Sequence, residues 1–382
     1  NTVQIRLEIK NEQGKDIKKI EIEDMDSIII RNVYESGISY LDITATPVKY
    51  LDCYKISKIY YGENEEQKLS EKLEIQFFKE ISSYSDWQGI DKTSAQNYKL
   101  MSDIDLNGRN EINSNISIGR LDGNGFAIKN AIVLIEESGG LIKELKKEMY
   151  NITFENINRT CNNSGNYLGI IGNNSGRLNN VTFKNITINA PNRNYVACIA
   201  KNNAEYIDNV LLEEINIVGN SYVGSLIGNT YEQNITNINA NNITIKGNGH
   251  YVGGIIGQLS WSDYMQYPNT KDINIDTATV VGNNYVGGVY GYGRAYYIQA
   301  RGVKVNGENY VGGISGYVYY KNGWSDIYDS EINGTGNNIG GITGWHDWLQ
   351  YCNVINCKIK GIGANSSNVG GVCGYSKQRS GY

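Results

Sequence analysis

The sequence lacks the features that mark several common classes of protein. It has no run of about eighteen apolar residues, so no segment is long enough to cross a membrane as a helix. It has two histidines, His250 and His346, and neither belongs to a His-Glu-x-x-His motif, which excludes that kind of zinc peptidase centre from this chain. The net charge is −5, and lysine and arginine are scattered, which argues against nucleic-acid binding.

The cysteines follow no spacing that is typical of a zinc site. The six are Cys53, Cys161, Cys198, Cys352, Cys357 and Cys373. Cys198 stands where the repeats described below carry a glycine, which indicates a small buried residue rather than a metal ligand. Cys352 and Cys357 could form a disulfide only if a corner brings their Cα atoms together. We therefore expect mostly free thiols, and no cofactor in this chain.

A glycine-rich motif recurs along the C-terminal two-thirds of the chain. One copy is Tyr310-Val311-Gly312-Gly313-Ile314-Ser315-Gly316. Other copies start at Tyr167, Tyr195, Tyr222, Tyr251 and Tyr285, and degenerate copies start at Glu137, Asn338 and Asn368. A repeat of this length, sustained over so many copies, predicts a solenoid rather than a globular fold.

Each repeat also contains short segments in which apolar and polar residues alternate, as in Ile186-Thr187-Ile188 and Ile243-Thr244-Ile245. This alternation predicts strands, and the asparagine and glycine clusters between the segments predict tight corners. Three strands and three corners in about 28 residues make one coil of a right-handed parallel β-helix. The paired glycines fit sharp turns or close backbone approach. No lysine and hydroxyl of a nucleotide-binding loop accompany them.

The repeat is missing from the N-terminal part of the chain, which divides the sequence into three regions. We expect a small antiparallel β domain over 1–75, a cap and the first coils over 76–130, and the repeat-bearing β-helix over 131–382. Asp86 is expected to cap a short helix that covers the first coil. Because no signal peptide, initiator methionine or terminal cap is present, we expect a processed piece that continues into further domains.

Three segments precede the repeats: 80–87, 98–106 and Gly119-Arg120-Leu121-Asp122-Gly123-Asn124-Gly125. Together with the Val-Gly-Gly repeats, they resemble the N-terminal region of immunoglobulin A-cleaving zinc metallopeptidases of Gram-positive bacteria, over residues 80–374. In that family such repeats lie upstream of a catalytic domain, and the proteins are secreted and associated with the cell wall. The His-Glu-x-x-His motif of that domain is missing here, so no catalytic residue carries over. The resemblance implies the non-catalytic part of a secreted peptidase.

The loops after the glycine strands are polar in the early repeats and rich in aromatic residues in the later ones. The aromatic residues are Trp261, Tyr264, Tyr267, Tyr292, Tyr296, Tyr297, Tyr319, Tyr320, Trp324, Trp345 and Trp348. Stacked coils would gather them into a strip four coils tall on one edge. Clustered exposed aromatic residues are typical of interaction surfaces. Two interpretations remain open: a ligand-binding strip, or rings that fold back over the flank of the solenoid or against a packed domain.

A parallel β-helix is also compatible with a polysaccharide lyase or glycosidase, which would place carboxylates on neighbouring coils. The acidic pairs near the aromatic loops are Asp272 with Asp276 and Asp326 with Asp329. An aspartate at a corner usually accepts a backbone hydrogen bond instead, and no arginine or lysine stands at matching positions to serve a lyase. His346 has no nucleophile beside it and is expected to be a hydrogen-bonding loop residue. His250 is expected at a corner.

These observations favour a non-catalytic role on the surface of a Gram-positive bacterium. We expect the chain to hold and orient a downstream zinc peptidase, and to engage a host glycoprotein through the aromatic strip. Immunoglobulin A is the partner that the resemblance implies. The alternative is a free-standing adhesin that binds a host protein or glycan. Whether the full-length protein is an enzyme stays open.

Overall fold

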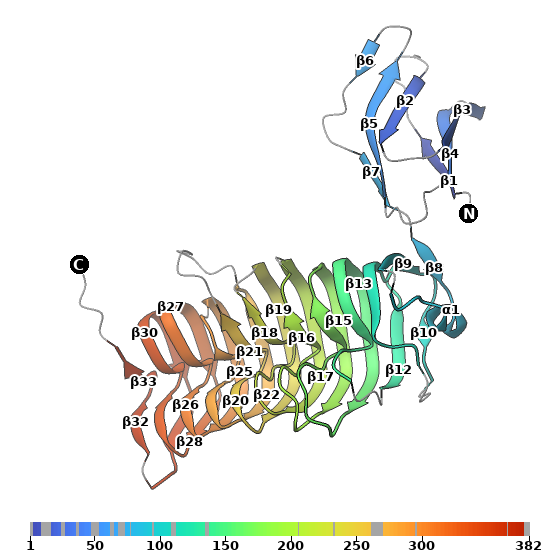
Figure 1. Cartoon of the computed structure of the whole chain (residues 1–382). Coiled ribbons are helices and arrows are strands. Elements are labelled where there is room, and N and C mark those ends of the chain that lie inside the picture. The colour runs from blue at the N-terminus through green and yellow to red at the C-terminus, as the bar shows by residue number, and fades with distance from the viewer. Residues whose placement is uncertain are drawn as a thin grey trace. The chain divides into compact units, whose positions relative to one another are not determined.

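The computed structural model of the chain is almost entirely β-structure (Figure 1). It describes the strands between residues 3 and 76, and residues 78–377 except 94, 108–111, 134–136, 205, 232–233, 261–269, 295 and 365. The chain forms two compact units, Asn1–Lys79 and Glu80–Tyr382.

The N-terminal unit contains two small antiparallel sheets, as the sequence predicted for this region. In one sheet the strand order is β1-β4-β3, and in the other it is β2-β5-β6, with β7 also paired to β5. The strands are β1 (Val3–Glu8), β2 (Ile17–Glu23), β3 (Ser27–Glu35), β4 (Ile38–Thr46), β5 (Cys53–Tyr61), β6 (Glu65–Gln67) and β7 (Leu73–Gln76).

A short helix and five strands form the start of the second unit. They are β8 (Lys79–Ile81), α1 (Tyr84–Gln88), β9 (Gln96–Leu100), β10 (Ile104–Asp105), β11 (Ile116–Asp122) and β12 (Ala127–Val133). Ser83, not Asp86, is the N-cap of the helix, because its side chain accepts a hydrogen bond from the Asp86 amide. Asp86 reaches back to the Ser82 amide, as in a capping box. Trp87 is fully buried, and its indole N–H donates to the Asn113 carbonyl.

The rest of the second unit is a parallel β-solenoid of about 9 turns with roughly 28-residue coils, which confirms the predicted fold. Its largest sheet winds through successive coils and also includes β8–β12. The remaining strands of this sheet are β13 (Ile142–Thr160), β14 (Ile171–Asn174), β15 (Arg177–Asn189), β16 (Ile199–Asn202), β17 (Tyr206–Gly219), β18 (Ile227–Tyr231), β19 (Asn234–Gly247), β21 (Ile256–Ser260), β22 (Ile273–Val281), β24 (Tyr290–Tyr292), β25 (Tyr296–Gly307), β27 (Ser315–Tyr328), β28 (Glu331–Gly334), β30 (Thr343–Ile355), β31 (Lys358–Gly361) and β33 (Cys373–Ser376).

A second parallel sheet forms where the glycine motifs of successive coils lie side by side. Its strands are β20 (His250–Gly253), β23 (Asn284–Gly287), β26 (Asn309–Gly312), β29 (Asn337–Gly340) and β32 (Ser367–Gly370). Equivalent residues pair across it, for example Val252 with Val286, and Val286 with Val311. The motif therefore supplies one face of the later coils, while in the earlier coils isolated bridges join its copies, as between Val196 and Val223.

The core consists of columns of aliphatic side chains that point into the coil. One column is in strict register from coil to coil and runs through Val181, Val210, Ile238, Ile273 and Ile298, all at most 1% exposed. Each fully buried side chain of this kind contributes about 1.5–3 kcal/mol. Since a coil covers only its two neighbours, this stabilisation depends on stacking.

The second glycine of the motif is required by the close approach of adjacent coils. A Cβ atom on Gly288 would collide with the carbonyl oxygen of Gly313, and one on Gly313 with that of Gly341. These contacts are with backbone, which cannot move aside without breaking the stack. The glycines therefore have the close-approach role that the sequence indicated.

The corners of the coils are formed by residues in the left-handed conformation, and asparagine tolerates it better than most residues. Asn151, Asn180 and Asn209 occupy one corner in three successive coils, with φ between 53° and 54°. The Asn180 amide donates to the Asn151 side-chain oxygen at 2.8 Å, and Asn209 donates to Asn180 at 3.3 Å. A ladder of asparagine side chains thus links these coils along the axis.

Candidate functional site

The asparagine column described above changes its chemistry in the later coils. After Asn237 and Asp272, the same left-handed corner is occupied by Tyr297, Trp324 and Tyr351, with φ of 51°, 48° and 51°. A left-handed conformation costs a residue with a Cβ about 1–2 kcal/mol. Three consecutive bulky aromatic residues at this corner therefore need a compensating interaction, which their stacking provides.

These three residues, called here the exposed ladder, stack along the solenoid axis. The Tyr297 and Trp324 ring centroids are 5.5 Å apart, and those of Trp324 and Tyr351 are 5.1 Å apart, with interplanar angles of 15° and 24°. Tyr297, Trp324 and Tyr351 are nevertheless 47%, 37% and 70% exposed. An apolar cluster held this firmly in contact with solvent is typical of a binding surface.

A second aromatic column, the tyrosine ladder, consists of the motif tyrosines Tyr195, Tyr222, Tyr251, Tyr285 and Tyr310. Consecutive rings lie 4.5–4.9 Å apart and are nearly parallel. All five have positive φ, so these corners too are left-handed. All five are half-buried, which indicates a role in packing the coils together.

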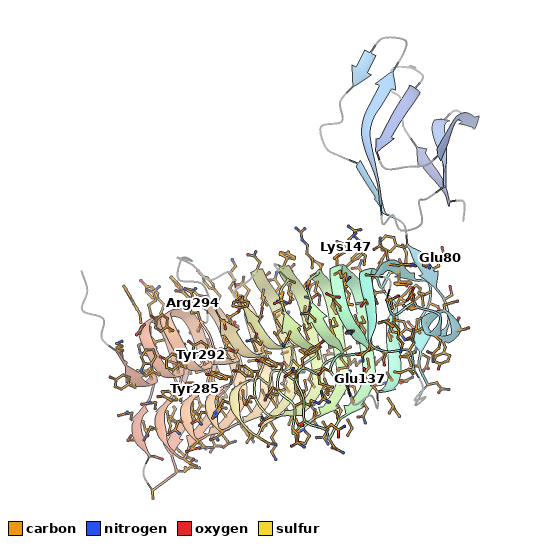
Figure 2. The ribbon with its side chains drawn as sticks, viewed as in Figure 1. Glu80, Glu137, Lys147, Tyr285, Tyr292 and Arg294 are labelled. Atoms are coloured by element: carbon orange, nitrogen blue, oxygen red, sulfur yellow. The ribbon has the colours of Figure 1, made fainter. Side chains whose placement is uncertain are left out.

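A third column packs edge-on against the tyrosine ladder. Tyr292, Tyr317 and Trp345 stack with centroid distances of 5.2 and 4.3 Å. Tyr292 also meets Tyr285 at 6.3 Å with an interplanar angle of 83°, and Figure 2 labels both side chains in the C-terminal half of the solenoid. Burial, with the neighbouring tyrosines, raises the pKa of Tyr292 to about 12. These rings cover the flank of the solenoid, as one of the two interpretations expected.

The aromatic residues named from the sequence therefore do not form one strip. Tyr292 and Trp345 lie in the packed column, and Tyr297 and Trp324 in the exposed ladder. Tyr296 is only 3% exposed. It precedes Tyr297, and neighbouring residues of a strand point to opposite faces. The expectation of a single edge was wrong because one loop feeds several columns of the coil.

The other members of the predicted strip lie elsewhere or outside the described residues. Tyr319 and Trp348 are 37% and 59% exposed, and Trp348 lies three residues before Tyr351 in β30, where it pairs with Lys321. The predicted residues whose side chains lie outside the described part of the chain are Trp261, Tyr264, Tyr267 and Tyr320.

Tyr351 was missed by the sequence interpretation, although a signal for it exists. It follows Trp324 by 27 residues, and Trp324 follows Tyr297 by the same interval, which is one coil. Its position was not evident because Tyr351 lies within β30 and joins Trp324 only through the stacking of coils.

The exposed ladder forms one wall of a shallow groove of about 650 Å³. The floor consists of the polar side chains of Asn274, Gln299, Asp326 and Asn353, which lie in register on successive coils. The Asn353 amide donates to Asp326 at 2.7 Å, which links two neighbouring coils of the floor. Asp272 also contributes to the lining. The groove thus combines one aromatic wall with a line of hydrogen-bonding groups.

The acidic pairs considered for a glycosidase behave as corner and ladder residues. Asp326 accepts hydrogen bonds from the Asn353 amide and from the Tyr328 hydroxyl. Asp329 has φ of 50° and accepts from Asn356 at 2.7 Å and from Arg301 at 3.3 Å. Both aspartates therefore link coils, and the bonds of Asp329 come from side chains rather than from the backbone donor that the sequence had favoured.

The first of those acidic pairs lies two coils earlier. The carboxylate of Asp272 lies 3.9 Å from the ammonium of Lys271. Asp276 accepts a hydrogen bond from the Thr277 hydroxyl at 3.4 Å. Asp272 has φ of 56° and is thus a corner residue of the same column as the exposed ladder.

Of the two histidines, His346 is 6% exposed and His250 lies on the surface beside Asn284. Burial lowers the pKa of His346 to about 4, although Asp347 opposes the shift. His346 is consequently neutral at physiological pH. Within the described residues, no group of three or more histidine, cysteine, aspartate or glutamate side chains could hold a metal ion.

Among the described residues, these cysteines form no disulfide: Cys161, Cys198, Cys352, Cys357 and Cys373. Cys161 and Cys198 are buried. Cys352 and Cys357 direct their sulfur atoms to backbone carbonyls of Gln350 and Ile355. The side chain of Cys53 lies outside the described residues. The described helix is too short to span a membrane.

Comparisons with known proteins give a distant likeness in structure. No protein-family model and no curated protein matches the chain. The chain is similar to a crystal structure from Bacteroides ovatus described as a "putative immunoglobulin A1 protease", with 16% sequence identity and a TM-score of 0.34. The superposition covers 78% of this chain and 84% of that chain. A likeness at this level carries no conclusion about activity.

Proposed function

We propose that this chain is the non-catalytic scaffold and substrate-recognition region of a secreted, cell-surface zinc metallopeptidase that resembles the immunoglobulin A proteases. The solenoid would act as a rigid arm that holds the peptidase domain and presents a recognition surface to a host glycoprotein. The observation that carries this proposal is the exposed ladder of Tyr297, Trp324 and Tyr351 beside its polar groove. Rigid aromatic side chains next to hydrogen-bonding groups are the usual centre of a protein interface.

A scaffold of this kind suits recognition because its surface is fixed in advance. Hydrogen bonds along the corners and stacking along the columns hold the wall and floor of the groove in place. A preorganised surface loses little conformational entropy when a partner binds. Recognition would therefore not require a rearrangement of the coils.

Binding of the purified chain to immobilised immunoglobulin A and to a glycan array tests this proposal. Saturable binding to immunoglobulin A supports a substrate-recognition region. Binding to glycans alone would contradict substrate recognition and support the adhesin function. If neither surface retains the chain, the recognition role is wrong and the solenoid is a spacer.

A further inference from the structure

The chemistry of the groove indicates which part of a partner it accepts. We propose that the groove binds an extended basic segment of a partner protein, with the charged head of a lysine or arginine beside Asp326 and its aliphatic stem along the exposed ladder. This inference rests on the proposed function only in treating the groove as a recognition surface. It names the chemistry of the occupant, whichever protein supplies it.

Stacking decides between a sugar and a protein side chain. Sugar rings bind to the flat faces of aromatic side chains, but the rings of the exposed ladder cover one another's faces at 5.1–5.5 Å. The ring of Tyr351 lies at the end of this stack and is 70% exposed. A lysine or arginine side chain needs no free ring face, because its aliphatic stem packs against exposed apolar surface while its charged head reaches a carboxylate.

The charge of the lining points the same way. Among the described residues that line the groove, Asp272 and Asp326 are acidic and none is lysine or arginine. Asp272 has a lysine near it, since the Lys271 ammonium lies 3.9 Å away. Among the described residues, the donors to Asp326 are neutral: the Asn353 backbone and side-chain amides and the Tyr328 hydroxyl. Its negative charge therefore favours a cation supplied by a partner.

The same face of the solenoid already holds a guanidinium in this way. The guanidinium carbon of Arg301 lies 5.3 Å from the centre of the Tyr328 ring, and its Nη1 lies 3.3 Å from the Asp329 carboxylate. An arginine between a tyrosine ring and an aspartate is thus a stable arrangement on this surface. Trp324, Tyr351 and Asp326 offer those groups to an outside cation.

The floor of the groove suits an extended chain rather than a helix. Asn274, Gln299 and Asn353 follow one line along the axis, one residue per coil. Side-chain amides both donate and accept hydrogen bonds, so they can pair with the N–H and C=O groups of an extended peptide. Such a peptide would lie along the axis with its basic side chain towards the exposed ladder.

Fluorescence anisotropy with short labelled peptides tests the proposal on the whole chain. One peptide carries arginine in a glycine and serine background, and its control carries glutamine at the arginine positions. We expect binding of the arginine peptide, weakened about fivefold by Asp326→Asn and by rising salt. Trp324→Ala should weaken binding about tenfold. Glu308→Gln, which removes one exposed negative charge outside the groove, and Trp348→Ala should leave it unchanged.

Equal binding of the arginine and glutamine peptides, or binding that is indifferent to Asp326→Asn, would overturn the inference. Competition separates it from the proposed function. Arginine-peptide binding without immunoglobulin A binding supports the groove and contradicts that partner. If the arginine peptide does not displace bound immunoglobulin A, the groove is not the site of that binding, and the recognition role of the chain stays intact. Displacement of the arginine peptide by a neutral glycan would assign the groove to sugars instead.

Discussion

Trp324 and Tyr351 stack across two coils with their ring centroids 5.1 Å apart, and both hold the left-handed backbone conformation. The equivalent corner of the earlier coils carries asparagines that hydrogen-bond to one another. Stacking thus replaces hydrogen bonding as the link between coils at this corner. The exchange places apolar rings in solvent where the earlier coils place amides, so the later coils acquire a surface suited to a partner.

Substitutions at Tyr285 should separate stacking from backbone strain. Tyr285 stacks on Tyr251 and Tyr310 and has φ of 57°. Tyr285→Ala should lower the free energy of unfolding by about 2–3 kcal/mol, because these stacking contacts and the edge contacts with Tyr292 and Tyr317 are lost while the strain stays. Tyr285→Gly should be milder by about 1 kcal/mol, since glycine adopts this conformation readily. Chemical denaturation measures both, and a glycine variant less stable than the alanine variant would refute this account.

Substitution by alanine should have very different effects on stability at two glycines of the repeated motif. Gly313→Ala places a methyl group against the carbonyl oxygen of Gly341 and should cost more than about 3 kcal/mol. Gly371 has the same place in the last motif, but nothing lies within 4 Å of its Cβ position. Gly371→Ala should therefore leave the melting temperature almost unchanged. Similar losses at both sites would contradict the role assigned to the close approach of coils.

His346 should make stability depend on pH in a defined window. Its pKa is about 4 in the folded chain and about 6.5 when exposed, so the unfolded chain takes up the proton first as pH falls. The stability contributed by the neutral imidazole is complete above about pH 6.5 and is lost down to about pH 4. His346→Gln should flatten the melting temperature across this window, whereas His250→Gln on the surface should not. An unchanged pH profile in His346→Gln would show that another group is responsible.

The solenoid could be predicted from the sequence because every coil repeats the same physical demands. Val181, Val210 and Ile238 recur at one interior position, and Gly288 and Gly313 recur where backbones meet. Such repetition shows in the sequence without any knowledge of distant contacts. The length of the coil and the parallel pairing follow from it.

The binding surface could be predicted only in part. Tyr296 and Tyr297 are neighbours in sequence, yet one is buried and the other is exposed. Which of two adjacent rings faces solvent depends on where the corner of the coil lies. An asparagine at a left-handed corner can be recognised in the sequence, whereas an aromatic residue at the same corner cannot. Tyr351 joins Trp324 only through the stacking of coils, so its place follows from the fold and not from its sequence neighbours.

One measurement tests the recognition surface most directly. It compares the affinity of the chain for immobilised immunoglobulin A with that of the Trp324→Ala and Tyr351→Ala double variant, using Trp348→Ala as an exposed tryptophan outside the groove. We expect the double variant to lose at least about tenfold in affinity with little change in melting temperature, and Trp348→Ala to bind like the parent chain. Equal affinity of all three proteins would contradict the assignment of the exposed ladder as the recognition surface.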